Sequence, residues 1–360
     1  MNVGVLAHRV VQQPFAAAVV IALVVVIVSL LRRSPVALQE LRGRPLARIA
    51  LWTVTSFALM AAAAPILAPP TSLRDPYLIP TTGFEIEPRP PDAFHPFGTT
   101  ENQFDLYYGI AWGARTAFKV TLSIVGVSLV LGFVLGGVAG YYGGVIDEIV
   151  MRITDVFLAF PGLVLAVVIV AVLGKGLDKI ILAIGAVNWP IYARLVRGEV
   201  LSLTGREFVT ASRALGGSNL RIILRHVMPN AIYPFLVYGS LDMGNVVIVS
   251  AALSFLGLGT EIGYADWGQL IALSRKWILG APGHAFVYWY TVVFPAVAIT
   301  LFVLGWNILG DAIRDLADPR LRRPTAHRSR ATLERLARLP GGAAGSGPPQ
   351  IDRSPGSPRS

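Results

Sequence analysis

Seven long apolar runs constrain this chain more than any other feature of its sequence. A helix needs about 20 apolar residues to cross a bilayer, and each run approaches or exceeds that length. The composition agrees, because 54% of the residues are hydrophobic and only 14% are charged, whereas soluble domains carry about 25% charged residues. We therefore predict an all-α, polytopic transmembrane helix bundle with spans at residues 14–31, 47–68, 116–140, 155–174, 179–196, 229–257 and 287–309.

Basic residues are distributed unevenly between the runs, and this distribution predicts the orientation of the chain. Arginines gather in segments 32–48 and 197–228 and in the C-terminal segment, whereas segment 69–115 carries more acids than bases. Membrane proteins keep Lys and Arg on the cytoplasmic side. We therefore place the basic segments, segment 141–154 and the C-terminus in the cytoplasm, and segments 69–115 and 258–286 outside.

The first apolar run leaves two readings open. A signal peptide would also place an apolar run after a weakly basic start, but two arginines follow this run directly and no small-residue cleavage site is visible. We expect a retained extra span with a basic linker (1–46), then a transmembrane domain (47–318) with a long external loop (69–115). The last segment (319–360) is rich in Arg, Pro, Gly and Ser and is predicted to be a disordered cytoplasmic tail.

A basic segment, 206–228, interrupts the apolar runs and has the pattern of a helical hairpin. The residues that recur at helical spacing in its two halves are Phe208, Ala211, Ser212 and Leu215, then Leu220, Ile223, Leu224 and Val227. Gly216–Gly217 separates the halves, and Ser218 and Asn219 offer caps for the second helix. The pattern fits an amphipathic hairpin that lies on the lipid surface, and it fits equally a docking element for a cytoplasmic protein.

Asp242 is the one acidic residue deep inside a predicted span. Charged residues inside a membrane are costly and indicate function. The side chain either lines a hydrated pathway, together with Asn245 one turn further, or makes a structural hydrogen bond. A pathway position would also result if the backbone is broken between Gly239 and Gly244 and lines the pore, where the acid would stay hydrated. A third reading is that the predicted boundary of the span is misplaced.

Several kinds of chemistry are missing from the sequence. The chain contains no cysteine, and its five histidines form no pair at metal-ligand spacing, so we expect no metal site. It has no Gly-x4-Gly-Lys-Ser/Thr phosphate-binding motif and no Gly-x-Ser-x-Gly nucleophile motif. We therefore expect that the chain is not an enzyme and binds no cofactor itself. The glycine pairs at 136–137 and 143–144 are predicted to allow close helix packing.

Longer motifs carry a resemblance to a known family. The segments that resemble the dipeptide/oligopeptide/nickel permease subfamily of ABC importer membrane subunits are GYYGGVIDEIVMRITDVFLAFPGLVLA at 140–166, YARLVRGEVLSLTGREFVTASRALGGSNLRIILRHVMPNAI at 192–232, LSFLGLG at 253–259 and LGDAIRDLADPRLR at 309–322. The external segment HPFGTTENQFDLYYGIAWGAR at 95–115 is similar as well. The type resembled is the second permease of the pair, and the resemblance covers about residues 40–323.

The resemblance implies a type I ABC importer-like bundle of six family spans, to which the first run would add one. It implies a permease for di- or oligopeptides, with nickel and glutathione as alternatives, in a prokaryotic plasma or inner membrane. The implied partners are a second permease subunit in a heterodimer, two cytoplasmic ATPase subunits that bind ATP and Mg²⁺, an extracytoplasmic substrate-binding protein, and membrane lipid. Nucleic acid is not an expected partner, despite the net charge of +10.

The resemblance also gives the hairpin a role, as the coupling helix that docks into a cleft of the ATPase. Thr210 stands where the family has an acid, and Ser212 stands where it has a second alanine. The residues implied in ATPase coupling are Glu207, Thr210, Ala211, Ser212, Arg213, Gly216, Arg221, Arg225 and Pro229. Asp242 and Asn245 remain candidates for lining the pathway.

Two other classes of protein compete with this reading. An ion-coupled secondary transporter usually shows internal repeats and several buried acids, whereas this sequence shows one candidate acid and no clear repeat. A membrane anchor without transport would leave the hairpin lying on lipid. A proton uncoupler would stop uptake by the former, and the latter would never retain an ATPase on purification.

Overall fold

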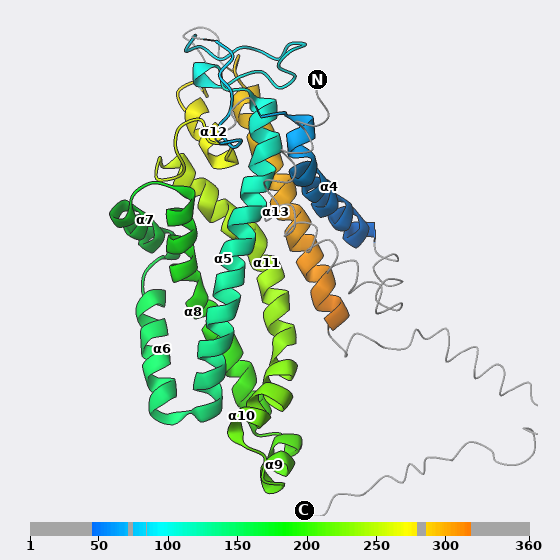
Figure 1. The fold of residues 1–360 in the computed structure, drawn as a ribbon, viewed down its shortest axis with the longest axis vertical. Helices are drawn as coiled ribbons and strands as arrows, with labels where there is room; N and C mark the ends of the chain where they lie inside the picture. Colours follow the sequence, from blue (N-terminus) through cyan, green and yellow to red (C-terminus); the bar gives the residue numbers. More distant parts are fainter. Residues whose placement is uncertain (1–44, 71–74, 84, 279–285, 318–360) are drawn as a thin grey trace, which may run out of the picture. The chain divides into compact units, whose positions relative to one another are not determined.

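The computed structural model of the chain describes residues 45–70, 75–83, 85–278 and 286–317. The predicted first span and the predicted disordered tail lie outside the described residues. In chain order, the helices are α4 (Pro45–Leu67), η1 (Glu101–Gln103), α5 (Leu106–Tyr142), α6 (Gly144–Leu158), α7 (Gly162–Leu173), α8 (Leu177–Thr204), α9 (Glu207–Ala214), α10 (Asn219–Ile222), η2 (Ile223–Val227), α11 (Met228–Phe255), α12 (Trp267–Ser274) and α13 (Tyr290–Ala317) (Figure 1).

Five of these helices, α4, α5, α8, α11 and α13, contain a stretch long and apolar enough to cross a membrane. The pair α6 and α7 passes the same test only when taken together, and the two helices meet at 88°. Pairing between extended segments in the described part of the chain is limited to three isolated β-bridges. The predicted all-α, multi-pass membrane bundle is therefore confirmed.

Several predicted boundaries differ from the structure, and three of the differences have an identifiable reason. The run 155–174 is not one straight helix, because the chain turns before Pro161, which disfavours a helical residue ahead of it. The helix predicted at 116–140 begins ten residues earlier, where the Asp105 side chain accepts a hydrogen bond from the Tyr108 backbone N–H and caps α5. The proposed break near Gly244 is absent, since α11 runs unbroken past it and packs there against α13.

A stripe of glycines on α5 brings that helix close to α8. A Cβ added at Gly132 would lie 2.3 Å from the Tyr192 Cβ, and one at Gly136 would lie 2.2 Å from the Ala193 carbonyl oxygen. At Gly140 the nearest atom would be the backbone oxygen of Arg197, at 2.8 Å. Small residues four apart allow this approach in membrane bundles. The predicted packing role therefore holds for the first glycine pair, since Gly136 packs on α8 and a Cβ at Gly137 would lie 2.7 Å from the Met228 side chain of α11.

The second glycine pair does something else. Gly143 and Gly144 have φ values of +63° and +56°, and a Cβ at either position would meet no atom within 4 Å. Positive φ values are costly for other residues. This pair therefore separates α5 from α6, and the predicted packing role for it is wrong.

Candidate functional site

The hairpin of residues 206–228 lies between α8 and α11, at the end of the bundle opposite α12 (Figure 1). Val209, Ile222 and Val227 are fully buried and anchor it in a cluster with Tyr192 of α8. Residues 219–255 are helical without a gap, because α10 continues through η2 into α11. A movement of the hairpin would therefore pass directly into α11.

The turn between the two halves has a specific geometry. The Gly216 N–H donates to the Arg213 carbonyl and the Gly217 N–H donates to the Ser212 carbonyl, both at 3.0 Å. These two bonds, with Gly216 at φ +78°, are those of a Schellman cap, which ends a helix at a left-handed residue. A Cβ at Gly216 would meet no atom within 4 Å, whereas one at Gly217 would lie 2.8 Å from the Ser212 oxygen. Gly216 is thus required for its backbone angle and Gly217 for its lack of bulk.

Large apolar side chains cover the outside of the hairpin. The exposed fractions are 89% for Leu215, 64% for Leu220, 62% for Leu224 and 40% for Phe208. The predicted stripe therefore faces outward in its first half, and Val209, which is not part of it, is the buried residue of α9. Exposed apolar residues on this scale are typical of surfaces that are covered by a partner or by lipid.

The other residues implied in coupling divide into two sets. Arg213 holds the hairpin together, because its guanidinium carbon lies 5.5 Å from the centre of the Tyr141 ring, and the Tyr141 hydroxyl donates to Asn219 Oδ1 at 3.0 Å. Ser218 precedes α10, but its side chain makes no cap hydrogen bond. Arg213 is nevertheless exposed, as are the candidates Glu207, Thr210, Ala211, Gly216, Arg221, Arg225 and Pro229, and Ser212 is partly buried.

The turn from α10 into α11 is a π-helix, η2, that sequence periodicity does not reveal. Single π-turns inside α-helices are often found at functional sites. The sequence gives only a weak indication of this π-helix. Leu220 and Leu224 keep α-helical spacing, but the buried residues are Ile222, Ile223 and Val227.

Asp242 lies in α11 with 5% of its surface exposed, surrounded by hydrogen-bond donors. Asn188 Nδ2 donates to its Oδ2 at 2.5 Å, and the Tyr192 hydroxyl donates to the same oxygen at 2.8 Å. Asn245 Nδ2 lies 3.3 Å from Oδ1. The hydrogen-bonding reading of Asp242 therefore holds, and its partners come from α8 as well as from α11.

A cavity of about 270 Å³ lies in front of this cluster, between the α6–α7 bend, α8 and α11. Asn188 and Asn245 line it, but Asp242 does not. The other lining residues are apolar or glycine: Phe157, Leu158, Phe160, Gly162, Leu163, Ala166, Ile184, Val187, Ile191, Val246 and Val249. Of the two residues predicted to line the pathway, Asn245 therefore lines this cavity and Asp242 does not, and Asn188, which was not among the predicted residues, lines it as well.

Ion pairs join α6 to α8 on the hairpin side of this cavity. Arg197 forms a two-pronged pair with Asp147, and the Nη2–Oδ2 distance is 2.5 Å. Arg194 Nη2 lies 2.6 Å from Asp155 Oδ1. Within the described residues, no three His, Cys, Asp or Glu side chains are grouped so as to hold a metal ion.

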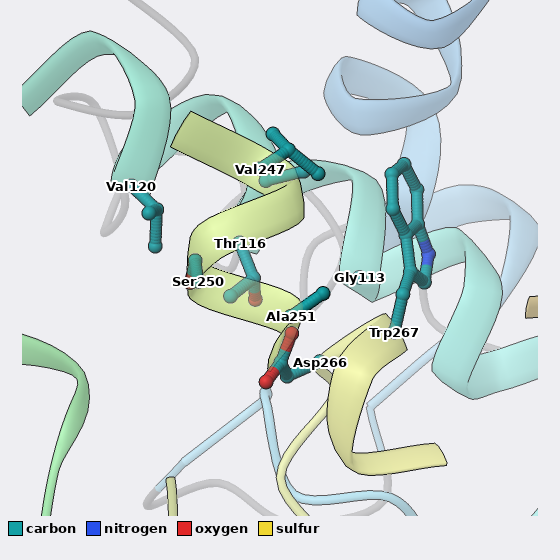
Figure 2. A pocket seen from close by; sticks show the side chains of 9 residues that line it. Gly113, Thr116, Val120, Val247, Ser250, Ala251, Asp266 and Trp267 are labelled. Atoms are coloured by element: carbon teal, nitrogen blue, oxygen red, sulfur yellow. The ribbon is translucent and has the colours of Figure 1, made fainter. Parts of the chain in front are cut away.

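A second, much smaller cavity lies toward α12, with about 10 Å³ available to the centre of a water molecule, which is roughly the space that one water needs. Residues from α5, α11 and α12 line it, among them Thr116, Ser250 and Asp266 (Figure 2). Asp266 caps α12 through the Gly268 N–H, 3.3 Å from its Oδ1. Burial raises the pKa of this carboxyl above its usual range.

Comparisons with known proteins agree with this architecture. A family model described as "Binding-protein-dependent transport system inner membrane component" matches residues 132–323. The dipeptide transport system permease protein of Alkalihalophilus pseudofirmus is 40% identical over 286 residues, which cover 79% of this chain and 90% of that protein. The probable D,D-dipeptide transport system permease protein of Escherichia coli is 35% identical, with 78% of this chain and 89% of that protein covered.

A glutathione transport system permease protein of Pectobacterium atrosepticum is 36% identical over 64% of this chain and 75% of its own length. Among solved structures, a chain of the MetNI methionine ABC transporter matches at a TM-score of 0.38 and 24% identity, over 54% of this chain and 94% of that one; this score supports no comparison of geometry. The resemblance to peptide permeases is confirmed by the sequence matches. The chain therefore belongs to the family of binding-protein-dependent transport system inner membrane components.

Proposed function

We propose that this chain is a permease subunit of an ATP-driven ABC importer and forms part of the pathway for di- or oligopeptides. The names of its relatives support peptides first and glutathione second. The observation that carries the proposal is the hairpin, whose apolar side chains are exposed in a chain of this family. Nickel remains an alternative from the sequence resemblance alone.

The hairpin is proposed to dock on a cytoplasmic ATPase subunit. Leu215, Leu220 and Leu224 supply apolar contact area, and the arginines at 221 and 225 supply charge around it. A short helix with an apolar stripe that enters a groove is a common mode of recognition. In this arrangement the hairpin, the C-terminus and the arginine-rich segments are cytoplasmic.

The connection of the hairpin to α8 and α11 supports this proposal. The hairpin continues into α11 without a break and follows α8 after a short turn. These same two helices meet again where Asn188 and Tyr192 of α8 donate to Asp242 of α11. Closure of the ATPase dimer would therefore move both helices that hold the 270 Å³ cavity, which is the rigid-body kind of switching used in alternating access.

The complete transporter would contain a second permease subunit, two ATPase subunits that bind ATP and Mg²⁺, and an extracytoplasmic binding protein. A direct test purifies the assembly through a tag on this chain, reconstitutes it in vesicles and measures uptake of a dipeptide. We expect uptake to require ATP and to be lost when the phosphate-binding lysine of the ATPase is replaced. Uptake that persists with that lysine replaced, or that falls with a proton uncoupler at unchanged ATP, would refute the proposal.

A matched pair of substitutions tests the docking surface. Leu215→Asp places a charge on a side chain that is 89% exposed, so folding should be preserved while the ATPase subunits are lost on purification. Phe94→Asp changes a residue of equal exposure, 88%, outside the hairpin, and should leave ATPase retention unchanged. Equal retention by both variants would favour the lipid-surface reading of the hairpin.

A further pair tests the turn. Gly216→Val forces a β-branched residue into φ +78°, which costs about 1–2 kcal/mol locally, and should uncouple ATP hydrolysis from uptake while insertion stays largely intact. Gly216→Asn should retain coupling, because Asn tolerates left-handed angles. Normal coupling in the valine variant would count against a role for the turn.

A further inference from the structure

We propose that Asn188 and Asn245 form a recognition site for the α-ammonium group of a peptide passing through the 270 Å³ cavity. The inference rests on the proposed function and deepens it, because it names the chemical group that the pathway recognises. Both side chains line the cavity, and both are oriented from behind by the same buried carboxylate.

The orientation of the two amides follows from hydrogen-bonding capacity. Each Asn turns its NH₂ group, and not its oxygen, toward Asp242, whose carboxyl oxygens accept both hydrogen bonds. Nδ2 of Asn188 and Nδ2 of Asn245 lie 2.5 Å and 3.3 Å from the carboxylate oxygens. Within the described residues, Oδ1 of neither side chain makes a hydrogen bond. Two amide oxygens are therefore available as hydrogen-bond acceptors for a ligand in the cavity.

The surroundings favour a cationic donor over other ligands. No side chain that lines the cavity is ionisable, so nothing there would pair with a substrate carboxylate. The hydrogen bonds from the two amide NH₂ groups to Asp242 make the amide oxygens stronger acceptors, because hydrogen bonds polarise one another in a low-dielectric interior. A peptide N-terminus offers three N–H donors and a positive charge to these oxygens.

The same set of ligands does not suit a bare divalent metal ion. Mg²⁺ and Ca²⁺ take six or more oxygens, usually with carboxylates among them, and nickel sites favour imidazole or thiolate. The cavity offers two amide oxygens and otherwise apolar or aromatic walls. Such walls accept varied side chains without selecting one, so the site would recognise the common end of peptides and tolerate their differences.

The test uses the absence of cysteine from this chain. Val249→Cys places a single thiol on the cavity wall, one turn from Asn245, in the otherwise complete permease–ATPase complex. The rate of alkylation at position 249 is measured with L-alanyl-L-alanine and, separately, with N-acetyl-L-alanyl-L-alanine, without the binding protein. We expect the free amine to protect the thiol at about tenfold lower concentration, the size of one hydrogen bond to a charged group.

Further substitutions, each combined with Val249→Cys, test whether the two asparagines cause the preference for the free amine. Asn245→Leu, at an exposed position, should abolish the tenfold difference in protection between the two dipeptides. Asn188→Leu removes the other amide acceptor and tests the same expectation. Leu163→Ala, on an apolar part of the wall, should weaken protection by both peptides equally.

Equal protection by the two dipeptides, no protection by either, or a preference that survives both asparagine substitutions would overturn the inference. The ATP-driven uptake assay described above is scored separately. Uptake without this selectivity rejects the recognition site alone, whereas absence of ATP-driven uptake by the wild-type assembly rejects the proposed function.

Discussion

Asp242 and Asp266 are both buried, with 5% and 9% of their surfaces exposed, yet their surroundings differ. Asp242 receives donors from three side chains, of which Asn188 and Tyr192 belong to another helix. Asp266 receives the backbone N–H of Gly268, and its Oδ2 has no hydrogen-bond partner within the described residues. Both carboxyl oxygens of Asp242 therefore accept hydrogen bonds, whereas only one carboxyl oxygen of Asp266 does.

The difference shows how each acid contributes to the molecule. Buried polar groups are tolerated when their hydrogen bonds are made, so the donors around Asp242 allow an acid to remain inside a span. Since those donors come from α8, the cluster ties α8 to α11. Asp266 caps only its own helix, α12, and burial of its carboxyl raises its pKa.

The largest effect is expected from Asp242→Leu, which keeps the bulk and removes the acceptor. Asn188 Nδ2 and the Tyr192 hydroxyl would then be buried without partners, and each such group costs about 1–3 kcal/mol. We expect a loss of about 2–5 kcal/mol in the free energy of unfolding, measured by thermal or denaturant unfolding of the purified protein. Asp242→Asn keeps one acceptor oxygen and should therefore lose less stability. A leucine variant as stable as the wild type would show that the Asp242 cluster does not stabilise the packing of α8 on α11.

How much of this was visible in the sequence differs between the two acids. Asp242 could be identified because an acid inside an apolar run is rare. Its partners could not, since Asn188 and Tyr192 lie in a different span and reach it only through the packing of α8 on α11. Asp266 was missed, although an Asp directly before the apolar segment WGQLIAL is a recognisable helix cap.

The same limit applies to the fold and the hairpin. Apolar runs were sufficient to locate α4, α5, α8, α11 and α13, because a span must satisfy its own backbone inside the bilayer. Pro161 explains why the chain breaks between α6 and α7, but the 88° angle between the two helices and the buried face of α9 depend on tertiary contacts. Helical spacing alone placed Phe208 and Leu215 on one apolar face, but both are exposed and Val209 is the buried residue of α9.

A second prediction concerns pH. The pKa of Asp266 is raised in the folded state, so the folded state binds this proton more tightly than the unfolded chain does. The group therefore contributes stability at low pH. This contribution is lost as the pH rises from the unfolded pKa, about 4, through the folded pKa. Asp266→Asn keeps a good cap residue and removes the titration. We expect the melting temperature of the variant minus that of the wild type to increase with pH across this window.

The control for this experiment is Asp92→Asn. Hydrogen bonds from the backbone N–H groups of His95 and Phe94 hold the pKa of Asp92 below its usual range, so its contribution to stability is lost as pH falls, which is the opposite sign. A difference curve for Asp266→Asn that is flat, or that slopes in the direction of the Asp92 control, would show that Asp266 has found a partner that the described residues do not contain.

The smallest effect, from Tyr192→Phe, separates the members of the Asp242 cluster. The change removes one donor, at 2.8 Å, and leaves Asn188 in place, so the loss should be close to the average of about 0.6 kcal/mol for a hydrogen bond between membrane helices. Tyr238→Phe is the matched control, because this neighbouring ring contacts Tyr192 while its hydroxyl makes no hydrogen bond in the described part of the chain. If Tyr192→Phe costs no more than the control, Asn188 alone links α8 to Asp242. If it costs as much as Asp242→Leu, the tyrosine is the main link between α8 and Asp242, and the hydrogen bond from Asn188 adds little stability.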